Sequence, residues 1–145
     1  MKERTNHFQV QIISPNGLVY MKNALKCHVQ SVAGGLTILP NHITMITALE
    51  ISPVIVTPLK NQDDLDYIAI NGGLLEVRDN DLTIIANMAI RARDIDDANA
   101  QMEKSLAENA MKQALINKDI KAYHMAEIDL KKALNQLDVF KHRHD

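Results

Sequence analysis

The sequence predicts a chain of two parts, an antiparallel β-sandwich or barrel of short strands followed by an antiparallel hairpin of two helices. All five glycines and all four prolines lie at or before Gly73, so neither helix-breaking residue occurs after it. From Ala86 onward alanine becomes frequent while valine and threonine nearly vanish, which is a change from strand formers to helix formers. We therefore place a β domain at residues 1–88 and a helical domain at residues 89–145.

The first part shows the pattern of half-buried strands. In residues 8–12 and 25–30, apolar and polar side chains alternate, as expected for strands with one buried face. Further short apolar runs occur at residues 36–39, 54–57, 67–70, 74–77 and 82–86. Three segments between such runs predict turns, because Gly, Asn and Asp tolerate a positive φ. They are SPNG (14–17), NGG (71–73) and DND (79–81).

The second part shows two helical stripes of apolar residues at steps of three and four. The first stripe consists of Ile95, Ala98, Met102, Leu106, Ala110 and Ala114. The second consists of Tyr123, Ala126, Leu130, Ala133 or Leu134, Leu137 and Phe140. The segment INKD (116–119) predicts a break between the helices. Because the break contains neither Gly nor Pro, one continuous helix remains an alternative.

Composition restricts the possible partners. The 16 basic and 18 acidic residues give a formal charge of −2, which indicates neither a nucleic-acid-binding surface nor a polybasic membrane patch. The single Cys27 allows no intrachain disulfide and fits a reducing compartment. No apolar stretch approaches the roughly 18 residues of a membrane helix. We expect any membrane association to occur through another protein.

The sequence contains no pattern typical of a catalytic or metal site. It lacks GxSxG, GxxxxGK[ST], HExxH and CxxC. We expect Cys27 to be a buried packing residue, and His42 to be either solvent-exposed or a contact residue in a loop. His142 and His144 are expected to lie in a solvated tail, and the acidic run at residues 63–66 at a solvated turn. We therefore predict a non-catalytic protein without a metal.

Three segments resemble the epsilon subunit of bacterial F-type ATP synthases. They are GGLTILPNH (34–42), YIAINGGLLEV (67–77) and LTIIANMAIRARDID (82–96), and KKALNQL (131–137) extends the similarity into the second part. The resemblance implies a β-sandwich of about ten strands followed by a helix-turn-helix, in line with the spacing of the apolar runs. It also implies a subunit that is not itself an enzyme.

The resemblance implies a rotor function. In that family the sandwich docks on the gamma subunit and the membrane-embedded c-ring, so that proton flow turns the three together. The helical hairpin either folds on the sandwich or extends into the alpha/beta catalytic head and restrains ATP hydrolysis. The implied location is the cytoplasmic face of the bacterial cell membrane. A nucleotide-sensing module, or an adaptor acting outside the synthase, remains the alternative.

The resemblance also implies contact residues. Those facing the c-ring would be Ser31, Val32, Ala33, Gly34, Gly35, Leu36 and His42, although Gly35 stands where the family often has an acidic residue. Three lysines on the second helix, Lys121, Lys131 and Lys132, could meet acidic segments of the beta subunits. Nearby acidic residues nearly balance these lysines, so a neutral solvated face is equally compatible with the sequence.

Some family members bind ATP through the motif [IL]-D-x-x-R-A at the start of the first helix. Here the segment reads IDDANA (95–100), in which Ile95, Asp96 and Ala100 match. Asn99 replaces the arginine whose guanidinium supplies charged donors. Ile90 replaces a glutamate, and Lys132 and Gln136 replace arginines. We therefore expect no useful ATP site and no cofactor.

Overall fold

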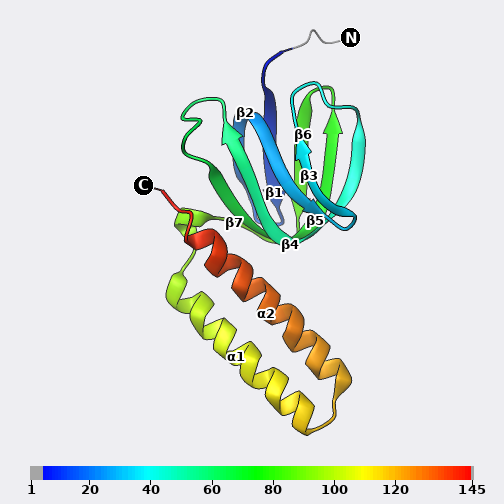
Figure 1. Cartoon of the computed structure of the whole chain (residues 1–145), viewed down its shortest axis with the longest axis vertical. Helices are drawn as coiled ribbons and strands as arrows, with labels where there is room; N and C mark the ends of the chain where they lie inside the picture. Colours follow the sequence, from blue (N-terminus) through cyan, green and yellow to red (C-terminus); the bar gives the residue numbers. More distant parts are fainter. Residues whose placement is uncertain (1–4, 145) are drawn as a thin grey trace.

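The computed structural model of the chain describes residues 5–144, in which a β body carries a long helical hairpin at one end (Figure 1). The described elements are β1 (Phe8–Ser14), β2 (Gly17–Ser31), β3 (Gly34–Ile38), β4 (Met45–Pro58), β5 (Asp66–Arg78), β6 (Asp81–Ala86), β7 (Ala89–Arg91), the 3-10 helix η1 (Ala92–Asp94), α1 (Asp97–Ile116) and α2 (Ile120–Phe140). This order confirms the predicted fold class.

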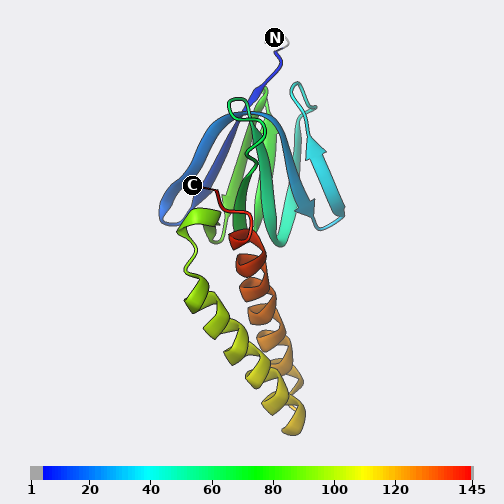
Figure 2. The same ribbon diagram turned by 60° about the vertical axis from the view of Figure 1, so that its left-hand side comes forward.

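The strands form a sheet that closes on itself around the core (Figure 2). The strand order is β1-β6-β5-β4-β2-β3, and β1 also pairs with β2. Along β1 every second residue is buried, as the alternating sequence predicts. The largest fully buried side chains come from most of the strands and include Ile12, Ile38, Ile68, Ile70, Leu75, Leu82 and Ile84.

Two of the three predicted turns are confirmed, and the third is wrong. SPNG and DND join β1 to β2 and β5 to β6, and Asp79 and Asn80 have φ values of 50° and 65°. NGG instead lies inside β5, which runs without interruption for 13 residues. Two runs that were expected as separate strands therefore merge. The described residues accordingly form seven strands instead of about ten.

Gly73 makes this uninterrupted strand possible. Its φ is +157°, and a Cβ atom built on it would lie 2.4 Å from the carbonyl oxygen of Ile85 on β6. No side chain fits at that distance, so glycine is required by the close approach of two backbones.

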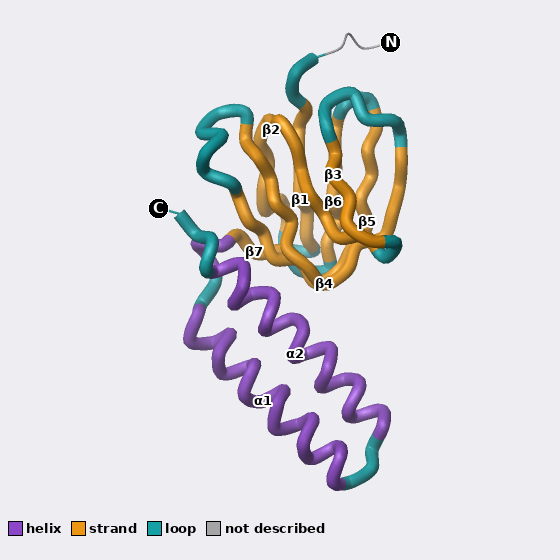
Figure 3. Tube along the Cα trace, in the orientation of Figure 1, coloured by secondary structure: helices purple, strands orange, loops and turns teal. Residues whose placement is uncertain are grey.

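The helical break is confirmed at the predicted place (Figure 3). Between the helices, Lys118 has a φ of 55°, a left-handed conformation that ends α1. Asp119 then caps α2 by accepting a hydrogen bond from the Ala122 amide at 3.0 Å. The two helices run antiparallel, so the structure has a hairpin and not one continuous helix.

The predicted apolar stripe of the first helix is largely wrong. The buried residues of α1 are alanines spaced seven apart, Ala100, Ala107 and Ala114, of which the stripe contained only the last. Met102 and Leu106 are 56 % and 60 % exposed. On α2, Ala126 and Ala133 are buried at the same spacing, as predicted. Small side chains at heptad positions allow the helix axes to approach closely, so alanine fills the seam between the helices.

The hairpin is attached to the β body by the C-terminal end of α2. Val139 is fully buried in a small apolar cluster with Ala69, Ala92 and Ile95. One turn earlier, the Asn135 side-chain amide donates a buried hydrogen bond to the Ile70 carbonyl at 3.2 Å. Residues 89–91 pair with β5, so the chain leaves the sheet after Arg91, whereas the domain boundary expected from the sequence lies after residue 88.

Candidate functional site

The described residues contain little reactive chemistry. Within residues 5–144, no three His, Cys, Asp or Glu side chains gather to hold a metal ion. Burial raises the pKa of the Cys27 thiol to about 12, so the thiol stays protonated at neutral pH and packs in the core. None of the helices in this part of the chain is long and apolar enough to cross a membrane.

A row of apolar side chains crosses the outer face of the sheet. Register pairing places five of them side by side on five neighbouring strands: Ala48, Leu74, Ile85, Ile13 and Leu18. Leu74, Ile85 and Leu18 are 44 %, 58 % and 54 % exposed. We call these five residues the apolar row.

The core does not require the apolar row to be apolar. Successive residues of a strand point to opposite faces, and the neighbours Ile12, Ile84 and Leu75 already fill the interior. Two further exposed apolar residues lie near the row: Ile46 is two positions from Ala48 on β4, and Met21 is three positions from Leu18 on β2. A contiguous apolar patch of this kind on a rigid surface is typical of a protein interface.

The segment Ser31–Leu36, predicted to face a partner, forms the tight turn between β2 and β3. The Ser31 hydroxyl accepts a hydrogen bond from the Ala33 amide at 3.1 Å and donates one to the Gly34 carbonyl at 2.8 Å. The Val32 amide donates to the Ala48 carbonyl at 3.0 Å. The turn is therefore held next to one end of the apolar row, and the Val32 side chain is exposed there.

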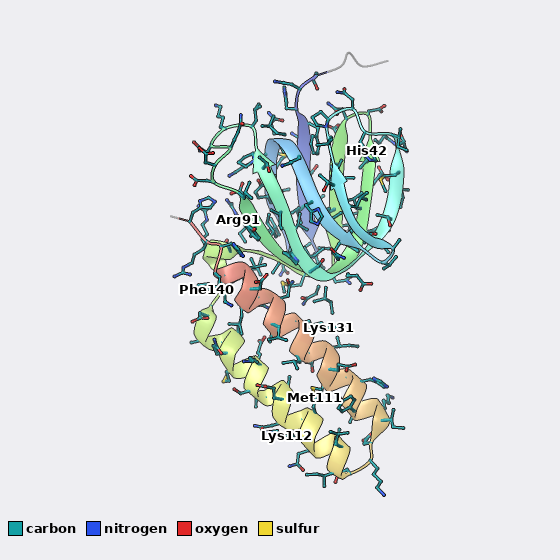
Figure 4. All side chains as sticks on the ribbon, in the orientation of Figure 1. His42, Arg91, Met111, Lys112, Lys131 and Phe140 are labelled. Atoms are coloured by element: carbon teal, nitrogen blue, oxygen red, sulfur yellow. The ribbon has the colours of Figure 1, made fainter. Side chains whose placement is uncertain are left out.

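His42 lies apart from that turn. It is partly exposed in the loop after β3 and bonds through Nδ1 to the Ile43 carbonyl at 2.9 Å. This loop is at the end of the β body farther from the helices, and the Ser31–Leu36 turn is at the nearer end (Figures 1, 2 and 4). The length of β3, about 17 Å, separates the two. The structure thus does not bring His42 together with the other predicted contact residues.

The residues of the nucleotide motif have structural roles. Ile95 is buried under the β body, Ala100 is buried in the helix seam, and Asp96 caps α1 by accepting from the Asn99 amide at 3.1 Å. The Asn99 side chain donates to Glu103 at 3.1 Å. The groove beside the seam is lined by Asn71, Glu103, Leu106, Ala107, Ala110, Asp129, Lys132 and Gln136. Two carboxylates against one ammonium group make this groove unfavourable for phosphates.

The three predicted lysines do not form one patch. Lys121 is exposed in the first turn of α2, near the tip of the hairpin. Lys131, labelled in Figure 4, lines a groove between α2 and β4. Lys132 lines the groove on the α1 side. One flat acidic surface could not contact all three in this arrangement.

A buried polar cluster was missed by the sequence analysis. Asp66, expected at a solvated turn, is buried at the start of β5 and accepts hydrogen bonds from the Tyr20 hydroxyl and, at 2.9 Å, from Lys22. His144, expected in a solvated tail, bonds to the same carboxylate at 3.1 Å. Burial and the bond to Asp66 raise the pKa of Tyr20 well above its ordinary value. Residues 19–23 show no alternation of apolar and polar side chains, so no local pattern pointed to Tyr20 and Lys22 as partners of Asp66.

Comparisons with known proteins cover nearly the whole chain. Residues 7–92 match the family described as ATP synthase, Delta/Epsilon chain, beta-sandwich domain, and residues 93–141 match its long alpha-helix domain. The ATP synthase epsilon chain of Lacticaseibacillus casei is 39 % identical over 139 residues, which are 96 % of this chain and 97 % of that protein. The ATP synthase epsilon chain of Lactobacillus helveticus is 37 % identical over 134 residues, 92 % of each protein.

A solved structure supports the fold. A chain in the Euglena gracilis mitochondrial ATP synthase, in a structure of OSCP, F1 and c-ring, superposes with a TM-score of 0.77 at 15 % identity. The superposition covers 94 % of this chain and 82 % of that one. The sandwich and the helical hairpin therefore occur together in both.

Proposed function

The chain belongs to the ATP synthase delta/epsilon chain family, and from this membership we propose that it works as the epsilon subunit on the central stalk of a bacterial F-type ATP synthase. It is a non-catalytic subunit of that complex and is associated with the membrane peripherally, through the complex. Its position would be the cytoplasmic face of the bacterial cell membrane. Its partners would be the gamma subunit, the c-ring and the alpha/beta catalytic head.

The observation that carries this proposal is the apolar row on a closed sheet. Because β1 pairs with both β2 and β6, the β body is a rigid unit that can transmit torque between proteins bound to it. The row would dock on gamma, and the adjoining Ser31–Leu36 turn would meet the c-ring. His42, the other predicted c-ring contact, lies at the opposite end of β3 from that turn and would have to reach the ring separately.

Co-purification with the gamma subunit tests the rotor proposal. A chain that binds gamma stably supports it. A monomer that does not bind gamma but binds nucleotide would support the alternative, a nucleotide-sensing module or an adaptor outside the synthase.

The helical hairpin would restrain ATP hydrolysis, because its large apolar side chains point outward and are available to a second surface. Truncation after Asp96 removes both helices and keeps β7 and η1. We expect the reconstituted synthase with this variant to hydrolyse ATP roughly two- to ten-fold faster, the loss of a restraint of about 0.4–1.4 kcal/mol. Equal content of the truncated subunit in the purified complex is the control. Unchanged hydrolysis at equal content would contradict the inhibitory role.

ATP would not bind usefully to this chain. The motif arginine is replaced by Asn99, whose side chain is already bonded to Glu103, and the neighbouring groove carries excess negative charge. Charged hydrogen bonds contribute about 1.5–3 kcal/mol each, so losing several weakens binding by orders of magnitude. Calorimetry of the isolated protein with magnesium ATP should give a dissociation constant weaker than ~1 mM.

The matched comparison for this titration is Asn99→Arg, which restores the motif residue at the same capped position. Tighter binding by that variant is the expected result. A sub-millimolar constant for the unaltered protein would overturn the proposal.

A further inference from the structure

The C-terminal tail after α2 forms one wall of a pocket at the joint between the two parts of the chain. The pocket has a volume of about 210 Å³ and receives side chains from β2, the β4–β5 loop, β5, β7, η1 and the tail. The His142 ring stacks on the Tyr67 ring with centroids 3.9 Å apart and planes within 6°. Beyond it, Nε2 of His144 lies 3.1 Å from Oδ1 of Asp66. Arg91 and Phe140 are near this joint in Figure 4.

The polar end of the pocket is a buried anion. Burial alone would raise the pKa of Asp66, but the hydrogen bonds from Tyr20, Lys22 and His144 outweigh it and hold that pKa below its usual range. Asp66 is therefore ionised at neutral pH. A buried carboxylate requires donors or cations as neighbours, and His144 of the tail is one of them.

The tail is mechanically connected to the attachment of the hairpin. His142 lies two residues after Phe140, the last residue of α2. The buried Val139 directly precedes Phe140. The guanidinium of Arg143 lies 3.9 Å from the Phe140 ring centre and donates to the Phe140 carbonyl at 3.0 Å, which folds the tail back on the helix end. Movement of α2 away from the sheet would therefore break the contacts of His142 with Tyr67 and of His144 with Asp66.

We infer that the segment from His142 to His144 is a pH-responsive clamp, docked on Tyr67 and Asp66, that holds the helical hairpin against the sandwich. The contact of the tail with Tyr67 and Asp66 does not depend on the proposed function. A role of this contact in regulating the synthase rests on that function. A protonated imidazole binds a carboxylate more strongly than a neutral one, so acidification from pH 8 to pH 6 strengthens the clamp.

The other titratable and charged groups around the tail come from every element that lines the pocket. They are Tyr20 and Lys22 on β2, Lys60 and Asp64 in the β4–β5 loop, Asp66 and Tyr67 on β5, Arg91 on β7 and Arg93 on η1. Aspartate ordinarily titrates near pH 3.9 and histidine near pH 6.5. Since the pKa of Asp66 is lowered, its contribution is present above about pH 4 and is lost as the pH falls further. Asp66 thus stays ionised throughout the interval from pH 6 to pH 8.

Hydrogen exchange of the full-length protein tests the clamp. The measured quantity is the opening constant of the amides in the last two turns of α2, corrected for intrinsic exchange rates at pH 6 and pH 8. In the double variant His142→Ala with His144→Ala, we expect opening at pH 6 to increase roughly ten-fold, with a smaller increase at pH 8. His124→Ala, an exposed histidine elsewhere on α2, is the matched control and should leave opening unchanged.

A second variant tests the partner of the tail. Asp66→Asn keeps the shape of the side chain but removes its charge, so we expect the same loosening and no difference between pH 6 and pH 8. Amides of β4 and β5 report whether the sandwich itself is intact in that variant. Opening constants equal to those of the unaltered chain in the double variant would overturn the clamp. Because no synthase is present, this result is independent of the truncation experiment on ATP hydrolysis.

Discussion

Replacing Gly73 with alanine should lower the free energy of unfolding by about 3 kcal/mol or more. The new Cβ would lie 2.4 Å from the Ile85 carbonyl oxygen and 2.9 Å from the Ala86 Cα, and both are backbone atoms of β6 that cannot turn aside. The two central strands would have to separate, which disturbs the hydrogen bonds between β5 and β6. Urea denaturation followed by circular dichroism measures the loss.

Gly35→Ala is the matched control for this substitution. Gly35 lies in β3, where a Cβ would meet nothing closer than 3.4 Å and where the backbone does not adopt a positive φ. We expect the Gly35→Ala variant to lose less than about 1 kcal/mol of unfolding free energy in the same urea denaturation. Equal losses for the two variants would show that the close approach of β5 and β6 is not the cause.

Lysine at both Leu74 and Ile85 should weaken binding to gamma by about 100-fold while leaving the fold intact. These adjacent residues form the centre of the apolar row, and docking would bury two ammonium groups against an apolar partner. Both side chains are exposed in the free chain, so the core loses nothing. Titration of the variant against purified gamma, with urea denaturation alongside, separates binding from stability.

The control for this pair is lysine at Met102 and Leu106. These residues are as exposed as Leu74 and Ile85 but lie on α1, away from the sheet. We expect gamma binding to be nearly unchanged in this control. An equal loss in both double variants would mean that gamma does not dock on the apolar row.

The strands and two of the turns could be predicted because their causes are local. Alternation records which side of a strand is buried, and the Asp-Asn pair between β5 and β6 supplies its own positive φ values. The turn predicted at NGG (71–73) was wrong because glycine permits a tight turn and a close contact between two strands equally well. Which of these occurs at Gly73 depends on Ile85, a residue of another strand that the local sequence does not reveal.

The errors on the helices and the tail have a common cause in contacts between distant residues. Met102 and Leu106 fit the helical period, yet the facing helix selects alanine because the two backbones lie close together. Asp66 joins Tyr20 and His144, which are 46 and 78 residues away. The local sequence gives the charge of each side chain, but the topology of the fold determines which charged side chains contact one another.

Because the seam between α1 and α2 consists of alanines, the contact between the two helices contributes little free energy. Each buried alanine contributes one methyl group, about 0.8 kcal/mol, so the five seam residues supply only ~4 kcal/mol of apolar burial. A leucine seam of the same length would supply about twice that or more. The larger side chains, among them Met102, Leu106, Ile128 and Leu134, lie outside the seam. The large apolar side chains of the hairpin therefore remain exposed. A second protein that buried them could gain as much apolar free energy as the contact between the two helices supplies.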